Sequence, residues 1–442
     1  MQKPSYLPLA LLLIVSVLGV VFPSVPTTIV TEGIDTGDTA WMLVSAALVL
    51  LMTPGLAYFY GGMVNNKNVI STMLQSFIAM GVISILWVVV GFSLAFGEDI
   101  GGFIGNPTTF FMFNGVLDGK PWPLAATVPL VVFAFFQLKF AMITPALVTG
   151  SMAERINFKS YVLFMILFSL LVYTPLAHMT WHPDGYLFKM GVLDFAGGTV
   201  VHMSAGWAAL AGALYLKRRK SHAEAAYFPP ANIPFVLLGT GLLWFGWFGF
   251  NAGSAVGASA LAASAFATTN TAAAAAGLGW VLFDASKGKK VSALGFAIGA
   301  VVGLVAITPA AGFVTIPTSI FIGTVAGMIS NFVAHLRAKS TLDDTLDVFP
   351  CHGVGGMVGM VMTGIFATKG VNSAVADEGL AFGDTKLFLT HMLALVLVSV
   401  FAFGMSYLLL IVTNAILPLR VSEDDEKVGL DVSQHDEFLV DA

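Results

Sequence analysis

Apolar stretches of about 20 residues recur along the whole sequence, and this pattern restricts the possible folds more than any other feature. A helix of about 20 residues crosses about 30 Å of hydrocarbon. Of the 442 residues, 57% are hydrophobic and only 10% are charged, whereas a soluble domain carries about a quarter charged residues. The sequence lacks the segments of alternating polarity that mark a membrane β-barrel. We therefore predict an all-α polytopic membrane protein.

Eleven membrane spans are expected after a separate N-terminal segment. The apolar run from Tyr6 to Phe22 has the length of a signal-peptide core, but no clear cleavage site follows it. Residues 1–26 therefore form either a signal peptide, which we favour, or an extra helix. Residues 38–419 form the membrane domain and residues 420–442 a C-terminal tail. The expected spans are 41–60, 69–96, 124–150, 161–181, 197–217, 232–252, 257–284, 291–308, 316–337, 349–367 and 387–417.

The distribution of Lys and Arg predicts the orientation of the chain. Loops on one side of the predicted membrane carry most of these residues, and the positive-inside rule places that side in the cytoplasm. We expect a multi-pass protein of the plasma (inner) membrane, with its N-terminus outside after any signal removal and its C-terminus cytoplasmic. The richer loops hold Lys67, Arg155, Lys159, residues 217–220, Lys287, Lys289, Lys290, Arg337, Lys339, Arg420 and Lys427, and the poorer loops hold Lys120, Lys189, Lys369 and Lys386.

A faint internal repeat suggests how the spans are organised. Residues 56–63 in the first span resemble residues 246–253 in the sixth, and His202 in the fifth span corresponds to His352 in the tenth, 352 − 202 = 150 residues later. Two units of five spans have opposite topology because five is odd, and inverted repeats of this kind enclose a site at their interface in many transporters. We expect two inverted five-helix repeats followed by an eleventh, C-terminal helix.

The two histidines are the leading candidates for chemistry. An ionisable group at membrane depth is costly and marks a functional site by default, and imidazole can donate or accept a proton near neutral pH. Each ring could instead be structural and donate to a backbone carbonyl. Metal binding would need carboxylate or thiolate ligands, and only Cys351, the single cysteine, is adjacent. Because two histidines occupy matched positions, we favour a functional pair.

Other candidates lie towards the predicted outer side. Asp194 precedes the fifth span, where it could cap the helix or help to hold a cation at the entrance. The aromatic residues nearby could form an interfacial belt, but aromatic faces together with a hydroxyl such as that of Ser254 also suit a small cation. These aromatic residues are Phe136, Phe140, Trp181, Trp247 and Phe250.

Four motifs together resemble the ammonium transporter (Amt/Rh) family, on its Amt branch. They are Asp194-Phe-Ala-Gly-Gly-Thr-Val-Val-His202, Gly246-Trp-Phe-Gly-Phe-Asn-Ala-Gly-Ser254, His352-Gly-Val-Gly-Gly356 and Gly429-Leu-Asp-Val432, and the resemblance covers roughly residues 38–442. It implies a homotrimer of eleven-helix subunits with one pore in each. It also implies a transporter of ammonium rather than an enzyme, working without a cofactor or metal, and a trimeric PII-type regulatory protein as a cytoplasmic partner.

The resemblance implies roles for individual residues as well. Phe140, Trp181 and Ser254 would form an outer ammonium site with Asp194 supporting recruitment, and Phe140 and Phe250 would form a stacked gate. His202 and His352 would line the pore and take part in proton transfer, and Trp247 and Phe136 would line it too. The chain departs from the family at Lys139, which we expect to point outward or towards a neighbouring subunit. It departs again at His435-Asp436-Glu437, where the family often has His-Gly-Glu, which puts the docking of the tail in question.

Because a bare ammonium ion is costly to move into a low dielectric, we expect it to lose its proton near the gate of Phe140 and Phe250 and to pass His202 and His352 as ammonia, with or without a separate proton transfer. An ammonium sensor of the same fold and an Rh-like gas channel are the alternatives. A membrane redox enzyme with the two histidines as haem or copper ligands is a further alternative, but no CxxCH or other paired-histidine motif supports it.

Overall fold

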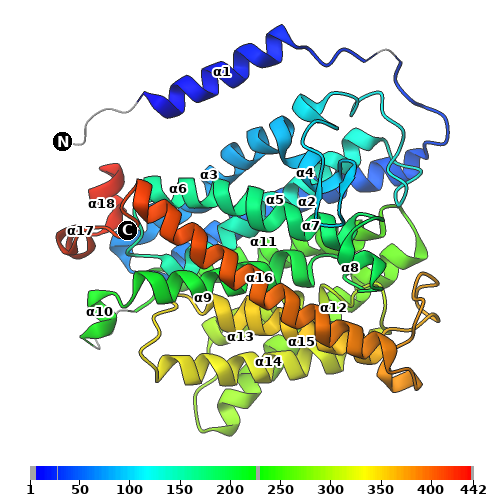
Figure 1. Cartoon of the computed structure of the whole chain (residues 1–442). Coiled ribbons are helices and arrows are strands. Elements are labelled where there is room, and N and C mark those ends of the chain that lie inside the picture. The colour runs from blue at the N-terminus through cyan, green and yellow to red at the C-terminus, as the bar shows by residue number, and fades with distance from the viewer. Residues whose placement is uncertain (1–5, 27, 225–228, 440–442) are drawn as a thin grey trace.

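The structure is a computed structural model that describes residues 6–26, 28–224 and 229–439. Long helices make up most of it and pack into one bundle (Figure 1). The elements are α1 (Leu7–Val21), α2 (Thr36–Met63), η1 (Asn66–Asn68), α3 (Val69–Leu86), η2 (Trp87–Gly91), α4 (Phe92–Phe96), β1 (Asp99–Ile100), β2 (Ile104–Gly105), η3 (Phe111–Phe113), α5 (Leu130–Met152), α6 (Phe158–Phe168), η4 (Ser169–Tyr173), α7 (Thr174–Trp181), α8 (Tyr186–Lys189), η5 (Gly198–Met203), α9 (Ser204–Leu216), α10 (Lys220–Ala223), α11 (Ile233–Ala252), η6 (Gly253–Ala255), α12 (Ala260–Ser286), α13 (Ala293–Ile307), α14 (Ile316–Ala338), η7 (Phe349–Val354), α15 (Gly355–Phe366), η8 (Leu380–Phe382), α16 (Lys386–Ile416), α17 (Glu423–Val428) and α18 (Leu430–His435).

Nine helical segments within the described ranges are long and apolar enough to cross a membrane, which makes the chain a multi-pass membrane protein. They match nine of the expected spans. The other two expected spans are also helical, but α12 is not among the nine and α13 has only 15 residues. The count of eleven spans and the inverted repeat therefore remain predictions.

The ends of the helices follow from local sequence. Short polar side chains at the first residue before a helix accept a backbone N–H that the helix leaves unpaired. Asp35 does so before α2, Ser259 before α12 and Ser292 before α13. The third span begins at Leu130, six residues later than expected, because residues 124–129 form a loop that ends at Pro129.

Helix α1 lies apart from the bundle in Figure 1, and none of its residues is buried. Its link to the rest of the chain includes a hydrogen bond from the Ser24 hydroxyl to the Met112 carbonyl. Its function as a signal peptide or as an extra helix remains a prediction.

Several helices contain a wider, π-helical turn, which often occurs at functional sites. The fifth expected span begins with such a turn, η5, and continues as α9, while the tenth begins with η7 and continues as α15. Two further examples are η2, between α3 and α4, and η4, between α6 and α7. The strands β1 and β2 pair to form a small antiparallel sheet.

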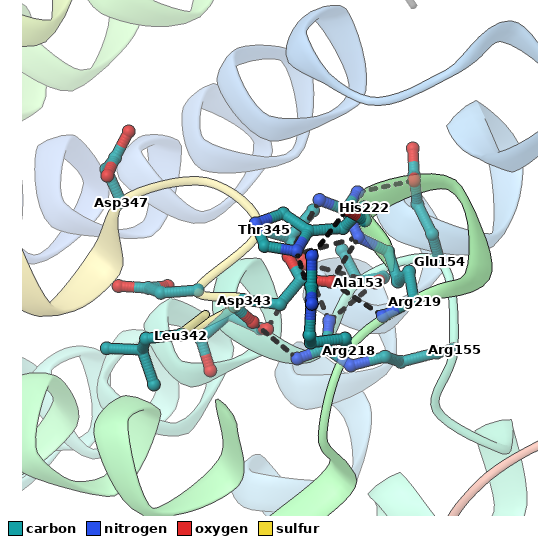
Figure 2. A network of polar contacts seen from close by, with 12 residues as sticks. Ala153, Glu154, Arg155, Arg218, Arg219, His222, Leu342, Asp343, Thr345 and Asp347 are labelled. Atoms are coloured by element: carbon teal, nitrogen blue, oxygen red, sulfur yellow. Dashed lines mark hydrogen bonds and ion pairs between the residues drawn. The ribbon is translucent and has the colours of Figure 1, made fainter. Parts of the chain in front are cut away.

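A polar network joins distant segments at the end of the bundle where the tail folds, which we call the tail end. Arg219 binds Glu154 at 2.6 Å and Asp343 at 2.8 Å (Figure 2). Buried Arg155 donates to the Asp343 carbonyl and to the Thr345 hydroxyl. Burial alone would raise the pKa of Asp343, but hydrogen bonds from Arg219 and the charges of Arg155 and Arg219 lower it to about 2.

The C-terminal tail is docked on the same chain through α17 and α18. The Asp431 carboxylate accepts the backbone N–H groups of Ile70 and Ser71 at 3.0 and 2.7 Å, and the Lys67 ammonium donates to the carbonyls of residues 426 and 427. Asp436, where the family often has glycine, ends α18 with a left-handed backbone of φ +57°. Asp tolerates this conformation better than most residues, so the tail docks without the glycine.

Candidate conduction site

A cavity of about 510 Å³ opens at the end of the bundle opposite the tail, and we call it the vestibule. Its floor is aromatic. Phe140 and Trp181 meet edge to face with their centroids 5.9 Å apart, and Phe136 meets Phe140 at 4.9 Å. Asp194 and Ser254 also line the cavity. The predicted outer residues therefore surround one cavity. Phe136 lines this vestibule and not the cavity beside the histidines.

A stacked pair of phenyl rings closes the bottom of the vestibule. The centroids of Phe140 and Phe250 lie 4.1 Å apart with an interplanar angle of 29°. Both rings are buried, and Phe250 also faces His202 with centroids 5.9 Å apart. Phe140 lines the vestibule and Phe250 lines the space beside the histidines, so the pair lies between the two cavities.

His202 and His352 lie side by side beneath the phenyl pair. Their rings are stacked at 5.4 Å and 29°, and their Nδ1 atoms are 3.4 Å apart. Trp247 also stacks on His202 at 5.3 Å and donates its indole N–H to the Thr308 hydroxyl at 2.9 Å. Both histidines are almost fully buried.

The contact between the two Nδ1 atoms fixes how protons are distributed over the pair. A hydrogen bond there requires that one Nδ1 carries a proton and the other offers a lone pair. In neutral rings, the first histidine then has an accepting Nε2 and the second a donating Nε2–H. The His202 Nε2 has no hydrogen-bond partner in the described part of the chain. The pair can therefore offer both a donor and an acceptor to a small polar molecule.

Two small cavities continue past the histidines towards the tail end. The first has a volume of about 10 Å³ and lies between both histidines, Trp247 and Phe250. The second, also of about 10 Å³, lies between His352, Cys351 and Tyr60. A volume of about 10–15 Å³ is what one water molecule needs, so each cavity fits one molecule of that size. Their other walls are apolar, which is unfavourable for an ion.

Asp194 organises the backbone that carries His202. One carboxylate oxygen accepts the N–H groups of Gly197 and Gly198 at 2.8 and 2.7 Å, and the other accepts the N–H and hydroxyl of Thr199 at 2.7 and 2.5 Å. The Trp181 indole donates to the Asp194 carbonyl at 3.1 Å. Asp194 is thus a helix cap that also links the vestibule to the turn bearing the histidine, and only 7% of it is exposed.

Glycines allow the two histidine-bearing segments to approach closely. Gly197 adopts a left-handed backbone with φ +117°, and a side chain at this position would collide with Val201. A Cβ on Gly206 would collide with the backbone of Gly353, immediately after His352. The close approach of Gly206 to Gly353 accompanies the short distance between the two imidazoles.

Asp344 is a site residue that the sequence analysis missed. Its carboxylate accepts the backbone N–H groups of Val348 and Phe349 at 3.1 and 2.7 Å, at the start of the turn that carries His352. Both Asp194 and Asp344 lie eight residues before their histidine (202 − 194 = 8 and 352 − 344 = 8). This shared spacing could have identified Asp344 from the sequence. Burial and the charge of Asp347 raise the pKa of Asp344 to about 6.

Lys139 is not among the residues that line the vestibule. It is partly exposed on the outer surface of α5, and its ammonium group lies 5.6 Å from the centroid of the Phe135 ring. Such a contact is weakly favourable. The lysine therefore does not add a repelling charge to the cavity walls.

Comparison with known proteins gives consistent results. A sequence model of the Ammonium Transporter Family matches residues 40–440. The chain is 46% identical over 406 residues to an ammonium transporter of Aquifex aeolicus, covering 91% of this chain and 93% of that protein. It is 45% identical over 402 residues to an ammonium transporter of Bacillus subtilis, covering 91% and 98%.

Solved structures give the same picture. The chain is similar to the crystal structure of Saccharomyces cerevisiae Mep2, with a TM-score of 0.83 and 35% identity over 89% of each chain. It is also similar to a structure described as "Sensor Amt Protein", with a TM-score of 0.82 and 29% identity over 90% of this chain and 98% of that one.

Proposed function

The chain belongs to the ammonium transporter family, and we propose that it captures ammonium in the vestibule, removes its proton and conducts ammonia past His202 and His352. The observation that carries this proposal is the pair of imidazoles, with Nδ1 atoms 3.4 Å apart, in a path whose cavities hold about one small molecule each. The apolar walls exclude charge, while the two rings supply hydrogen bonds to a neutral molecule.

Free energies favour deprotonation over passage of the ion. The idealised cost of moving an ammonium-sized ion into a low-dielectric interior is about 20 kcal/mol, and several kcal/mol remain after relaxation. One cation–π contact returns only about 0.5–2 kcal/mol. Removing a proton from a group with an amine-like pKa of roughly 10 costs about 4 kcal/mol at pH 7. The neutral route is therefore the easier one.

The vestibule has the features of a site for collecting the cation. Phe140 and Trp181 present aromatic faces, and the Ser254 hydroxyl donates to the Phe250 carbonyl at 2.8 Å, so its oxygen lone pairs stay available to a donor such as ammonium. The Asp194 charge lies in the same wall. The capture of ammonium is then electrostatic, and the stacked Phe140 and Phe250 rings form the barrier at which the proton is lost.

The paired histidines suit ammonia because ammonia both donates and accepts hydrogen bonds. The Nε2 lone pair of one ring and the Nε2–H of the other provide matching partners. Potassium cannot lose a proton, so it carries the full desolvation cost along the same path. The selectivity thus arises from a penalty on the competing ion.

The remaining features of the proposal follow from family membership and the positive-inside rule. The vestibule faces outward from the plasma (inner) membrane and the tail end lies in the cytoplasm. Three subunits form a homotrimer with one pore in each, and a PII-type protein binds the cytoplasmic face. The similar placement of Asp194 before His202 and Asp344 before His352 supports two inverted repeats.

A sensor of the same fold is the second candidate, favoured by one structural relative described as a sensor. Within the described residues after Arg420, α17 and α18 have six residues each and dock on the same chain. The relatives from Aquifex aeolicus and Bacillus subtilis, at 46% and 45% identity, are ammonium transporters, which favours transport.

Uptake measurements test the proposal. Expression of the chain should restore growth of an ammonium-uptake-deficient strain on low ammonium, and His202→Ala and His352→Ala should abolish uptake or admit potassium. His335→Ala is the matched control, because this histidine is partly exposed on α14 and is not among the residues that line the cavities. Wild-type rate and selectivity in both pore variants would remove the histidines from the mechanism.

The fate of the proton needs a separate measurement. Proteoliposomes containing the protein should be given an ammonium pulse while current is recorded. A current absent from protein-free liposomes would show that the proton crosses as well, and silence in the presence of uptake would establish neutral transport.

A further inference from the structure

A charged cluster lies beside the vestibule, outside the conduction path described above. His178, on α7, is completely buried and contacts Asp99 of β1, with Nε2 2.9 Å from the Oδ1 atom. The His178 Nδ1 atom lies 3.0 Å from the Ala95 carbonyl oxygen. The ring of His182 stacks on that of His178 with centroids 4.4 Å apart.

The hydrogen-bond partners determine the charge of His178. A backbone carbonyl and a carboxylate can only accept hydrogen bonds, so both ring nitrogens must carry a proton to bond them. His178 is therefore an imidazolium paired with the Asp99 carboxylate. The same Oδ1 atom also accepts the Gly102 N–H at 2.7 Å. Burial would raise the pKa of Asp99, but these hydrogen bonds and the charges of His178 and Lys189 bring it below its usual value.

His182 is the neutral member of the stacked pair. Its Nδ1 atom accepts the backbone N–H of Asp184 at 3.0 Å, so that nitrogen carries no proton. Two imidazolium rings at this spacing would repel each other, and the arrangement avoids that repulsion. His182 also meets Trp122, which lines the vestibule, with ring centroids 5.2 Å apart.

The cluster fixes the end of the helix that carries Trp181. His178 lies three residues before Trp181, on the last turn of α7, and residues at this spacing are neighbours on one helix face. A second hydrogen bond joins the hairpin that contains Asp99 to the start of α8. It runs from the Tyr186 N–H to the Gly102 carbonyl at 2.8 Å. Trp181 is thus held between this hairpin and the Asp194 carbonyl.

We propose that Asp99 and His178 form a charged clamp that positions Trp181 for the capture of ammonium in the vestibule. This inference rests on the proposed function, because it gives the clamp a role in capture. Asp99 and His178 are positioning residues and are not among the residues that line the vestibule. The clamp sets the apparent affinity for ammonium and leaves the later step past the histidines unchanged.

Asp99→Asn is the most informative variant because it removes the charge and keeps a hydrogen bond. Its amide can accept the Gly102 N–H and donate to a neutral His178 ring. We expect the half-saturating ammonium concentration to rise about tenfold, as for loss of a charged hydrogen bond, while the maximal rate stays near that of wild type. His178→Gln should show the same division between affinity and rate.

A matched control and a spectroscopic readout complete the experiment. Asp184→Asn breaks a nearby exposed ion pair with Lys189, whose side chains are 59% and 56% exposed, and such pairs contribute little. Nitrogen-15 NMR of the histidine rings at pH 7 should show an imidazolium signal in wild type. That signal should disappear in His178→Gln, which assigns it, and become neutral in Asp99→Asn.

The two readouts separate failure of the clamp from failure of the proposed function. An affinity in Asp99→Asn equal to that of wild type, or a neutral His178 ring in wild type, would overturn the clamp even if transport is normal. Absence of ammonium transport by wild type would overturn the proposed function, whatever the NMR result. A tenfold weaker affinity in Asp184→Asn as well would show that the effect does not come from the clamp.

Discussion

Removing the Asp344 carboxylate should displace His352. In Asp344→Ala, the backbone N–H groups of Val348 and Phe349 lose the acceptor that now lies 3.1 and 2.7 Å away. These groups open the turn that places His352 beside His202, three residues after Phe349. Asp344 is completely buried, so water does not readily replace it. The variant should therefore lose both stability and uptake.

The magnitude follows from the two orphaned donors. A buried hydrogen-bonding group left without a partner costs about 1–3 kcal/mol, so two such groups give roughly 2–6 kcal/mol. Each 1.4 kcal/mol corresponds to about tenfold in an equilibrium, so we expect uptake to fall at least about tenfold. Asp344→Asn keeps one acceptor oxygen but turns an amide N–H towards the other donor, and its loss should be smaller than that of the alanine variant.

The assay is uptake of labelled methylammonium into proteoliposomes, together with the thermal unfolding midpoint of the purified protein. Asp384→Ala is the matched control, because its carboxylate also accepts a backbone N–H, that of Lys386 at 2.9 Å, but in an exposed turn where water can replace it. Wild-type uptake and midpoint in Asp344→Ala would refute the reasoning that this carboxylate positions His352.

Three further predictions concern other parts of the chain. Trp247→Phe removes the 2.9 Å hydrogen bond to Thr308 and should slow uptake about fivefold, the equivalent of about 1 kcal/mol; unchanged uptake would show that this bond does not hold the indole in place. Asp436→Gly relieves a left-handed residue and should stabilise tail docking by roughly 1 kcal/mol, seen as slower hydrogen exchange in α18; faster exchange would contradict this. Asp343 has a folded pKa of about 2, below its unfolded value. Its contribution to the free energy of unfolding, roughly 2 kcal/mol, is therefore complete above about pH 4 and is lost as the pH falls through about 2. The midpoint of wild type should therefore fall between pH 4 and pH 2 more steeply than that of Asp343→Asn, and parallel curves would argue against the ion pair with Arg219.

The membrane spans could be predicted from sequence because hydrocarbon thickness sets their length. The two expected spans that are not among the nine are α12, which is rich in small residues, and α13, which has only 15 residues. Small residues reflect close packing: α12 packs along both α13 and α14, and a Cβ on Gly303 would collide with the backbone of Ala272. Hydropathy alone does not report this contact.

The residues around the path could be nominated from motifs, but their contacts could not. His202 and His352 are 150 residues apart in sequence, and their rings meet where Gly206 closely approaches Gly353 in the folded bundle. Both histidines also lie within π-helical turns, η5 and η7. No local propensity rule predicts them.

One feature that was missed had a signal in the sequence, and another had none. The eight-residue spacing of Asp194 to His202 recurs in Asp344 and His352, and it would have identified the second cap. The pairing of Asp99 with His178 had no such signal, because the hairpin and α7 are far apart in sequence and meet only in the folded bundle.

The central claim is that the cargo crosses without charge, and a comparison of ammonium with potassium tests it most directly. Proteoliposomes containing the wild-type protein should be exposed to equal gradients of either ion, with flux measured by stopped flow. We predict rapid ammonium flux and no potassium flux above that of protein-free liposomes. Potassium flux at a rate comparable to that of ammonium would contradict the account, because potassium has no proton to lose.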